Sequence, residues 1–439
     1  MKKILYILVL FFVISLVWDC KSSDPTKAKP GKKVAIQCDN GKAIRYHYDP
    51  ETGSILEKGL VALPKNLTCK QAENLEEKEM FKLKREGHWV IYYKNTTNIL
   101  AEGENKDNKR EGEWKFYDAQ GNLTKITLYK DGIKEGPEYG YFAGTKILRY
   151  EGQNQNDKKT GFWKYYSDKE HQCISQGNYV NDMKEGEWIE CSQDPKTNKW
   201  YVSFKGRYHQ ELKDGPAETY YPDGKLLSKG NYRADLKCKE NPPAEGEQAC
   251  AKKIGKWVFY FPNGNIMEEG NYDANTGRRT GLWKEYYESG QLRGQGNRNH
   301  TKIGIWTFYD KEGKIIGQYE FKGNDFMASY CIEFENNKKV AEGPCTAKMI
   351  KYEPEKDSLK ITPGMKQGKW KGYHPNGKLA WEGELLMDKR HGYWKIYDEA
   401  GNLIAEGDYN MGKKTGFWKE MENGKLVTHE YDMFGRLKK

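Results

Sequence analysis

The sequence predicts an all-β protein, an elongated repeat array of tandem antiparallel β-hairpins. Three observations predict this class. A Gly-x-Trp signature recurs at intervals of 23 to 29 residues wherever the series is uninterrupted. Short aromatic and β-branched runs alternate with glycine-containing turns, and an apolar period of 3.6 residues is confined to the N-terminus and a short helical pattern near 72–81. One supersecondary unit per period, stacked on its neighbours, explains this pattern.

The signature itself is a glycine followed two residues later by tryptophan. The copies are Gly87-His88-Trp89, Gly112-Glu113-Trp114, Gly161-Phe162-Trp163, Gly186-Glu187-Trp188, Gly255-Lys256-Trp257, Gly281-Leu282-Trp283, Gly304-Ile305-Trp306, Gly368-Lys369-Trp370, Gly392-Tyr393-Trp394 and Gly416-Phe417-Trp418. Degenerate copies begin at Gly136-Pro137 and Gly215-Pro216, where no tryptophan follows. We expect each glycine to serve the turn between units, and each tryptophan to open a strand and fill the space between neighbours.

The residues between signatures have the sequence pattern of a β-hairpin. In 112–134, two aromatic or β-branched runs are separated by a turn with Gly121, and a second polar turn leads onward. Similar turns recur around Gly224, Gly264 and Gly377, where Asn-Gly or Asp-Gly supplies the positive φ that tight turns need. These connections are too short to join parallel strands, so successive strands should alternate in direction.

Composition favours a thin aromatic core over thick aliphatic layers. Only 37% of the residues are hydrophobic and the mean hydropathy is −0.97, yet aromatic residues reach 13%, which a disordered chain would lack. The net charge of +10 arises from 73 basic and 63 acidic residues. That mixed surface is compatible with an anionic membrane or an envelope polymer, and export argues against nucleic acid as a partner.

The N-terminus has the pattern of an export signal. Lys2 and Lys3 precede an apolar run over 4–17 that is short for a membrane span. The junction ending at Cys20 resembles a bacterial lipobox, so we predict a signal peptide over 1–20 and lipid attachment at Cys20, with plain secretion as the alternative. Residues 21–33 are typical of a flexible tether.

The other eight cysteines indicate disulfides, because their number is even and the protein is expected to be exported. Pairing in sequence order is favoured, since the second and fourth pairs are centred on turn-like segments and would face each other across hairpins. The predicted pairs are Cys38–Cys69, Cys173–Cys191, Cys238–Cys250 and Cys331–Cys345. A metal site is disfavoured, because no Cys-x-x-Cys occurs and the histidines are scattered.

Lysine and tyrosine recur after the tryptophans and define a candidate binding face. Lysine often comes one residue after tryptophan and tyrosine three residues after it, so in a regular strand the two share a face opposite the tryptophan. A bulge that returns the tyrosine to the tryptophan's side is the alternative. The candidate residues are Lys115, Tyr117, Lys164, Tyr166, Lys284, Tyr286, Lys371, Tyr373, Lys395 and Tyr397. Either the lysine stems cover aromatic rings and keep the sheet soluble, or the face binds an acidic glycan or a phospholipid headgroup.

The pattern divides the chain into segments. Residues 34–80 are expected to form a divergent N-terminal hairpin that caps the array, and 81–439 the array itself. Insertions near 236–252 and 323–366 interrupt the period. Insertions in such arrays protrude from one side, as tolerated excursions or as sites of recognition.

The series Gly-x-Trp-x-x-Tyr, turn-Gly-x-Leu and Glu-Gly-x-Tyr resembles the bacterial variant of the MORN (membrane occupation and recognition nexus) repeat. Good copies lie at 392–409 and 281–296, and the resemblance covers about 87–439. It implies an elongated, twisted antiparallel β-array with a role in protein or lipid interaction. Many bacterial relatives carry an antitoxin label, which adds an antitoxin-like protein to the alternatives.

These observations predict a non-enzymatic interaction or scaffold protein. We expect it to be anchored in the bacterial cell envelope, as an outer-membrane lipoprotein, and to present its repeat surface to a protein partner. Binding of a glycan, cell-wall polymer or anionic-lipid headgroup through the lysine, tyrosine and tryptophan ladder is the alternative. No catalytic motif, cofactor motif or metal-ligand spacing occurs, so no cofactor is predicted.

Overall fold

The computed structural model describes residues 27–167, 172–244, 247–362 and 364–438. The predicted signal peptide, Cys20 and the first part of the tether lie outside these residues. The chain forms two compact units, Met1–Leu148 with Asn154–Asp157 and Arg149–Gln153 with Lys158–Lys439. We describe each unit by itself.

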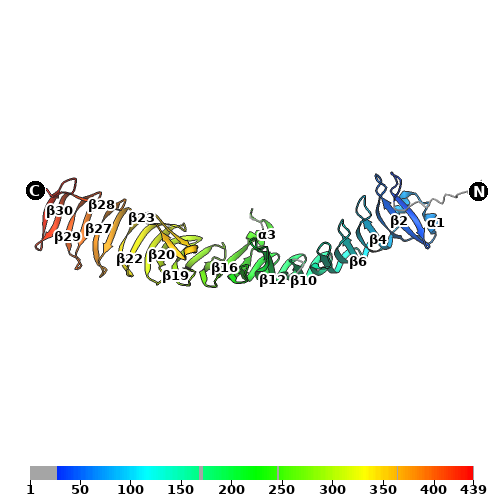
Figure 1. Cartoon of the computed structure of the whole chain (residues 1–439), viewed down its shortest axis with the longest axis horizontal. Helices are drawn as coiled ribbons and strands as arrows, with labels where there is room; N and C mark the ends of the chain where they lie inside the picture. The colour runs from blue at the N-terminus through cyan, green and yellow to red at the C-terminus, as the bar shows by residue number, and fades with distance from the viewer. Residues whose placement is uncertain (1–26, 168–171, 245–246, 363, 439) are drawn as a thin grey trace, which may run out of the picture. The chain divides into compact units, whose positions relative to one another are not determined.

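The first unit contains strands β1 to β8 and two short helices (Figure 1). Its elements are β1 (Val34–Asp39), β2 (Lys42–Tyr48), β3 (Ile55–Val61), α1 (Cys69–Ala72), α2 (Glu77–Lys82), β4 (Arg85–Tyr92), β5 (Ile99–Lys106), β6 (Lys109–Tyr117), β7 (Leu123–Lys130) and β8 (Ile133–Tyr141). Strand β9 (Leu148–Gln155) contributes residues to both units.

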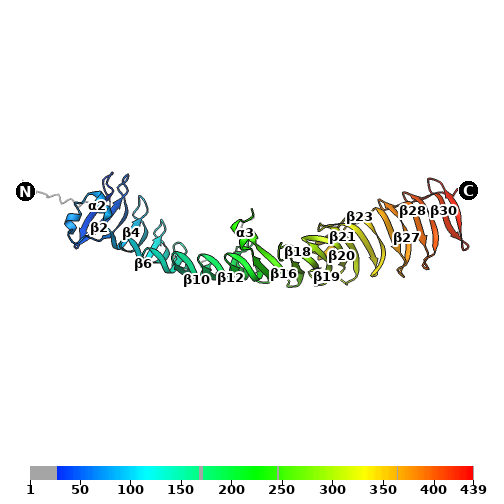
Figure 2. The same cartoon turned by 180° about the vertical axis from the view of Figure 1, so that it is seen from behind.

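The second unit contains strands β10 to β31, one short α-helix and two 3-10 turns (Figure 2). Its elements are β10 (Lys158–Tyr166), β11 (Ile174–Val180), β12 (Met183–Gln193), β13 (Trp200–His209), β14 (Leu212–Tyr220), β15 (Leu226–Ala234), α3 (Leu236–Glu240), η1 (Glu247–Cys250), β16 (Ala251–Tyr260), β17 (Ile266–Tyr272), β18 (Arg279–Tyr286), β19 (Leu292–Asn299), β20 (Thr301–Tyr309), β21 (Ile315–Lys322), β22 (Met327–Glu335), β23 (Lys338–Glu353), η2 (Pro354–Lys356), β24 (Ser358–Ile361), β25 (Met365–Lys366), β26 (Gly368–Tyr373), β27 (Leu379–Leu386), β28 (Lys389–Tyr397), β29 (Leu403–Asn410), β30 (Lys413–Glu422) and β31 (Lys425–Tyr431).

Within each unit, strands that follow one another in the chain pair antiparallel, as β5 does with β6 and β28 with β29. Strand β23 departs from this order, because it pairs with β22, β24, β25 and β26. The turns have the expected chemistry: Asp107 and Asn108, between β5 and β6, both adopt positive φ, of 50° and 71°. The predicted all-β array of tandem antiparallel hairpins is therefore confirmed.

The segment 34–80 contributes three strands of the first unit and the two short helices that pack on them. Ala72 of α1 and Met80 of α2 are buried in the same core as Trp89. Arg45 on β2 is also buried, and its guanidinium donates to the backbone carbonyls of Met80 and Leu83 at 3.2 and 2.9 Å. These bonds satisfy the end of α2 and hold it over the sheet.

The glycine of each Gly-x-Trp copy lies inside a strand, which corrects the expectation that it serves the turn between units. Gly103 of β5 faces Trp114 of β6, while its neighbour Glu104 faces Glu111, so Gly112 and Glu113 are extra residues on β6. This is a β-bulge. The glycines that open the ten copies all have φ between 60° and 78°, a conformation that other residues rarely adopt.

The bulge aims each tryptophan at a glycine of the preceding strand in the sheet. A Cβ atom added to that glycine would lie 2.0 to 2.6 Å from the indole ring in all ten copies. The indole Nε1 then donates to the carbonyl of the residue after that glycine, at 2.8 to 3.2 Å. The ten rings are at most 2% exposed. We call the face of each unit that carries them the inner face, and the opposite face the outer face.

A lysine or arginine four residues before each tryptophan lies over its ring. The cation lies 4.4 to 4.8 Å from the ring centroid in every copy, as with Arg110 over Trp114 and Lys414 over Trp418. Each such contact contributes roughly 0.5 to 2 kcal/mol, depending on desolvation. This position was missed in the sequence analysis, although a basic residue precedes all ten tryptophans at this spacing.

The two degenerate copies fill the space of the missing indole in different ways. In the first unit, Glu138 takes the tryptophan position. Its carboxylate accepts a hydrogen bond from the Thr127 hydroxyl at 3.2 Å and forms an ion pair with Lys134 at 3.4 Å. In the second unit, Ala217 takes that position and the buried ring of Phe204 occupies the space, with Lys213 4.1 Å from its centroid. The basic residue is kept in both cases.

The second insertion folds back onto the inner face, where the sequence analysis expected a protrusion. Its hairpin, formed by the end of β23 and by β24, places Tyr352 against Arg293, with 3.8 Å between the guanidinium carbon and the ring centroid. Asp357 at the hairpin turn accepts the backbone N–H of Glu288 at 2.6 Å and the hydroxyl of Ser289 at 2.9 Å. The hairpin thus connects strands that lie far apart in the sequence.

Beneath this hairpin, a buried carboxylate holds three cations. Glu285 lies 2.7 Å from Arg298, 3.2 Å from Lys302 and 3.4 Å from Arg293. Burial alone would raise the pKa of Glu285, but the three cations lower it to about 2. Glu285 is therefore ionised at neutral pH, and removing it would leave three buried cations without their shared carboxylate.

Candidate functional site

The outer face of the second unit carries one continuous row of residues that face each other across successive strands. The row contains the position after each tryptophan and the position before each glycine that faces a tryptophan. From β10 to β31 it reads Lys164, Gln176, Ile189, Lys205, Glu218, Lys229, Val258, Glu269, Lys284, Gln295, Thr307, Gln318, Ile332, Glu342, Lys371, Glu382, Lys395, Glu406, Lys419 and Thr428. We call it the central row.

Four of the five predicted lysines lie in the central row, and Lys115 has the equivalent place in the first unit, facing Glu102. Lys115 pairs with Glu113 at 3.5 Å and Lys164 with Glu151 at 3.7 Å. The other three predicted lysines make no ion pair within 4 Å in the described part of the chain. These are Lys284, Lys371 and Lys395.

The predicted tyrosines lie on the same outer face, so the bulge alternative does not apply to them. Each phenol donates to the glutamate that precedes a tryptophan-facing glycine. The pairs are Tyr117–Glu102 at 2.6 Å, Tyr166–Glu151 at 2.8 Å, Tyr286–Glu269 at 2.8 Å, Tyr397–Glu382 at 2.9 Å and Tyr373–Glu342. Burial and these bonds raise the pKa of Tyr117, Tyr166 and Tyr286 to about 12. The tyrosines therefore fix the glutamates of the outer face.

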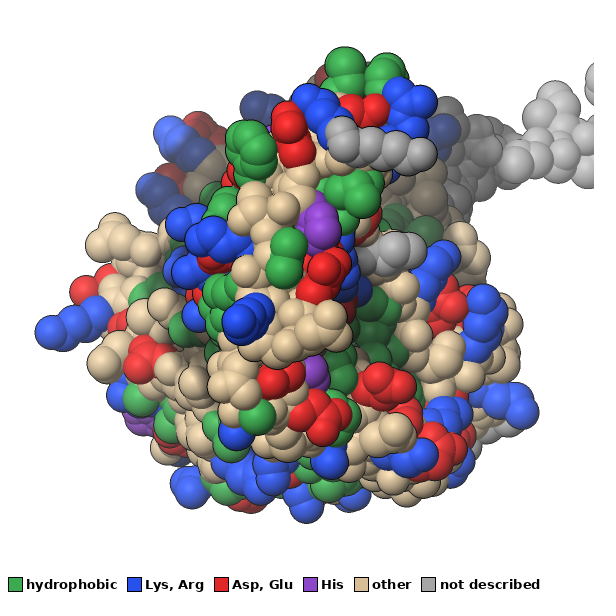
Figure 3. Space-filling model, turned by 90° about the vertical axis from the view of Figure 1, so that its left-hand side faces the viewer, with side chains coloured by type: hydrophobic (Ala, Val, Ile, Leu, Met, Phe, Trp, Pro, Cys, Tyr) green, Lys and Arg blue, Asp and Glu red, His purple; other side chains and the backbone are tan. Residues whose placement is uncertain are grey.

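A second outer row runs through the middle residue of each Gly-x-Trp copy. This position is charged in several copies and apolar or aromatic in five. The exposed fractions are 48% for Phe162, 53% for Leu282, 53% for Ile305, 51% for Tyr393 and 69% for Phe417. We call this the apolar row, and the sequence analysis missed it, because the middle residue varies from copy to copy. The space-filling view from the C-terminal end shows hydrophobic side chains exposed among mixed basic and acidic ones (Figure 3).

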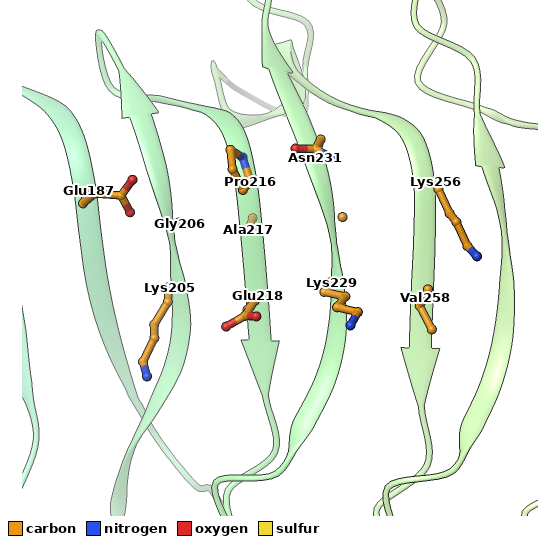
Figure 4. Close-up of a pocket in the computed structure, with 11 residues that line it drawn as sticks. Glu187, Lys205, Gly206, Pro216, Ala217, Glu218, Lys229, Asn231, Lys256 and Val258 are labelled. Carbon is orange, nitrogen blue, oxygen red and sulfur yellow. The ribbon is translucent and has the colours of Figure 1, made fainter.

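The outer face of the second unit is hollowed at the degenerate copy of β14. There a hollow of about 450 Å³ is lined by Lys205, Glu218 and Lys229 of the central row and by Pro216. The three charged side chains stand side by side on neighbouring strands (Figure 4). Gly206 and Ala217 also line this hollow, which is open to solvent and has a mostly apolar lining.

Four disulfides join the cysteines in sequence order. The bonded pairs are Cys38–Cys69, Cys173–Cys191, Cys238–Cys250 and Cys331–Cys345. The third encloses the first insertion, between α3 and η1. Four disulfides indicate a non-reducing compartment. Among the described residues, no helix is long and apolar enough to cross a membrane, and no cluster of three His, Cys, Asp or Glu side chains is arranged to bind a metal.

The periodic geometry agrees with a known repeat. Seven segments of the chain match the MORN repeat variant. They are residues 110–131, 213–234, 253–274, 279–300, 302–322, 366–383 and 390–411. Each MORN match begins at the lysine or arginine that covers the inner-face ring of its repeat, so the basic position belongs to the repeat as much as the tryptophan does.

No curated protein matches the chain. Among solved structures, the TcdB2-TccC3-Cdc42 structure is similar at 12% identity over 90% of this chain and 21% of that chain, with a TM-score of 0.15. The TcdB2-TccC3 structure is similar at 12% identity over 92% of this chain and 23% of that chain, with a TM-score of 0.16. This chain spans about a fifth of the length of the chains in these solved structures.

Proposed function

We propose that this chain is a non-enzymatic interaction protein of a bacterial cell envelope, and that the outer face of its second unit binds a protein partner. The apolar row is the observation that carries the proposal. Leu282, Ile305 and Phe417 leave half or more of their side chains in water, although each strand has a buried inner face available. Exposed apolar groups that recur in one row are typical of interaction surfaces.

The surroundings of the apolar row support this proposal. Protein interfaces combine a central group of apolar or aromatic anchors with a polar rim. Here the central row supplies that rim, as with Glu269, which pairs with Lys256 at 2.9 Å and faces Lys284, two residues from Leu282, on the next strand. Tyrosines already hold the outer-face glutamates in place, so little side-chain entropy would be lost when a partner binds.

The envelope location rests on two further observations. The disulfides indicate an oxidising compartment, and Cys20 follows the N-terminal apolar run over 4–17 by three residues. In this proposal a lipid on Cys20 anchors the chain in the outer membrane, and the tether lets the repeat units extend away from the membrane surface. Metabolic labelling with a fatty-acid analogue tests the anchor: the native chain should be labelled and Cys20→Ala should not, and equal labelling of both would reject it.

Affinity capture from envelope extracts tests the partner. The chain with Leu282→Asp and Ile305→Asp should lose at least about nine tenths of the captured partner, because two hot-spot losses of about 1 kcal/mol or more each compound. Met387→Asn is the matched control, since Met387 is 58% exposed but lies in a turn at positive φ, which asparagine tolerates. Equal recovery of the partner by the double variant and the control would reject the proposal.

A further inference from the structure

A pocket of about 400 Å³ opens on the outer face between β22 and β28. Tyr330 on β22 and Tyr393 on β28 line it from its two outermost strands, and Tyr393 is 51% exposed. Trp370 and Gly383, on the strands between them, line it as well. Its volume falls in the range of about 300 to 1,000 Å³ that small-ligand sites occupy.

The charged groups in this pocket alternate in sign across the strands. Glu342, Lys371, Glu382 and Lys395 face one another in register on β23, β26, β27 and β28. Lys369 and Glu384, a further facing pair, complete the lining. Three lysines and three glutamates sum to zero formal charge, so the pocket offers closely spaced donors and acceptors without a net field that would select a polyanion.

Two of the three carboxylates in the pocket are fixed by hydrogen bonds, and the lysines remain available as donors. Tyr373 and Lys339 hold Glu342, and Tyr397 donates to Glu382 at 2.9 Å. Lys371 and Lys395 make no ion pair within 4 Å among the residues that the structure describes. A ligand that both donates and accepts hydrogen bonds would therefore find carboxylates already oriented and ammonium groups without a competing carboxylate.

We propose that this pocket binds a pyranose ring of a glycan. Sugar hydroxyls both donate and accept, which matches the alternating lysines and glutamates. The C–H face of the ring would stack on the exposed phenol ring of Tyr393, whose π face is negative, and Tyr330 would close the opposite end. The pocket does not include Leu282 or Ile305, but it shares Tyr393 with the apolar row. The two proposals are tested by different variants, since Tyr393→Ala affects the pocket and the change of Leu282 and Ile305 to aspartate does not.

Calorimetric titration of the purified full chain with two neutral tetrasaccharides, an N-acetylglucosamine tetramer and maltotetraose, tests the proposal. At least one should bind. Tyr393→Ala should weaken that binding by about tenfold and Tyr393→Phe by less than about twofold, because the phenyl face is retained. Phe417→Ala is the matched control, since Phe417 has the same place in its own repeat and lies outside the pocket.

Lys371→Ala gives a second test if Tyr393→Ala alters the circular dichroism spectrum, and it should weaken binding as well. The double variant Leu282→Asp, Ile305→Asp should bind the sugar as the native chain does, which distinguishes sugar binding at this pocket from protein binding at Leu282 and Ile305. The proposal is overturned if neither tetrasaccharide binds, if only inorganic phosphate or heparin binds, or if Phe417→Ala weakens binding as much as Tyr393→Ala.

Discussion

The indole ring of Trp283 occupies the space that a side chain on Gly270 would need. A Cβ atom on Gly270 would lie 2.3 Å from the ring, and the indole nitrogen donates to the carbonyl of the next residue, Asn271, at 3.2 Å. The same relationship recurs in all ten Gly-x-Trp copies. It explains why the repeat needs two glycines, one to form the bulge and one to receive the ring.

Gly270→Ala should therefore destabilise the second unit by about 1 to 3 kcal/mol, the usual cost of overpacking a close contact. Urea denaturation followed by circular dichroism measures this change. Gly224→Asn is the control, because Gly224 lies in a turn with open space around it and asparagine tolerates its φ of 84°. Equal stability of Gly270→Ala and the native chain would show that the ring is not packed on the glycine.

Lys414→Ala should destabilise the last hairpins by about 1 to 2 kcal/mol, whereas Lys413→Ala should have little effect. Lys414 lies over the rings of Trp418 and Tyr431, at 4.8 and 5.1 Å from their centroids, while its neighbour Lys413 is exposed at the start of β30. The variant loses both the cation and the stem that shields the indole. Urea denaturation of the two variants, side by side, checks the prediction, and equal losses would contradict it.

Stability should fall as the pH rises above 10, and Tyr286→Phe should reduce that fall. Burial and the bond to Glu269 raise the pKa of Tyr286 from 10 to about 12. Between these values the unfolded chain releases the phenol proton and the folded chain keeps it, so the contribution present below pH 10 is lost as the pH approaches 12. Thermal melting at pH 9, 10 and 11 measures the slope. An identical slope in Tyr286→Phe would contradict the assignment.

Asp357→Asn should detach the hairpin of the second insertion and lower stability at neutral pH. Burial would raise the pKa of Asp357, but Lys311 and the bonds from Tyr352 and the Glu288 backbone keep it well below its usual value of 3.8. Its contribution is therefore present above pH 3.8 and lost as the pH falls below it. Melting of both chains from pH 7 to pH 2.5 should show their difference shrinking. Asparagine keeps the left-handed backbone at φ 45°, so the comparison isolates the charge.

Removing the disulfide between Cys331 and Cys345 should cost about 3 kcal/mol, as expected for a loop of about this length. The two residues are 14 apart in the sequence and both are buried. Urea denaturation of the Cys331→Ala, Cys345→Ala variant measures the loss. Reducing agent should destabilise the native chain further than it destabilises this variant, and an equal response would argue against the pairing.

The parts of the fold that follow from local chemistry could be predicted from the sequence. Turn residues with positive φ and short aromatic runs were sufficient for the hairpins. The cysteines pair in chain order, as predicted, because each pair lies within one local segment. The alternation of side chains along a strand was enough to place Lys284 and Tyr286 together on the face opposite Trp283.

Features that depend on strand register or on distant contacts could not be predicted in this way. The bulge at Gly281 makes three residues face one glycine of the neighbouring strand, which is visible only once β17 and β18 are paired. The hairpin of the second insertion contacts Ser289, which is 68 residues from Asp357 in the sequence, through a hydrogen bond that no local sequence pattern predicts. The position of Arg279 over the indole ring could have been predicted, because a basic residue stands at the same spacing before the tryptophan in every copy.

Site-specific photo-crosslinking in the native envelope tests the proposed surface most directly. A benzophenone amino acid is placed at Leu282 or Ile305 on the outer face, and at Met387 or Glu312 in exposed turns. We predict that the two outer-face positions capture the same protein and that the two turn positions do not. Capture of that protein from the turns alone, or no adduct from either outer-face position, would contradict the account.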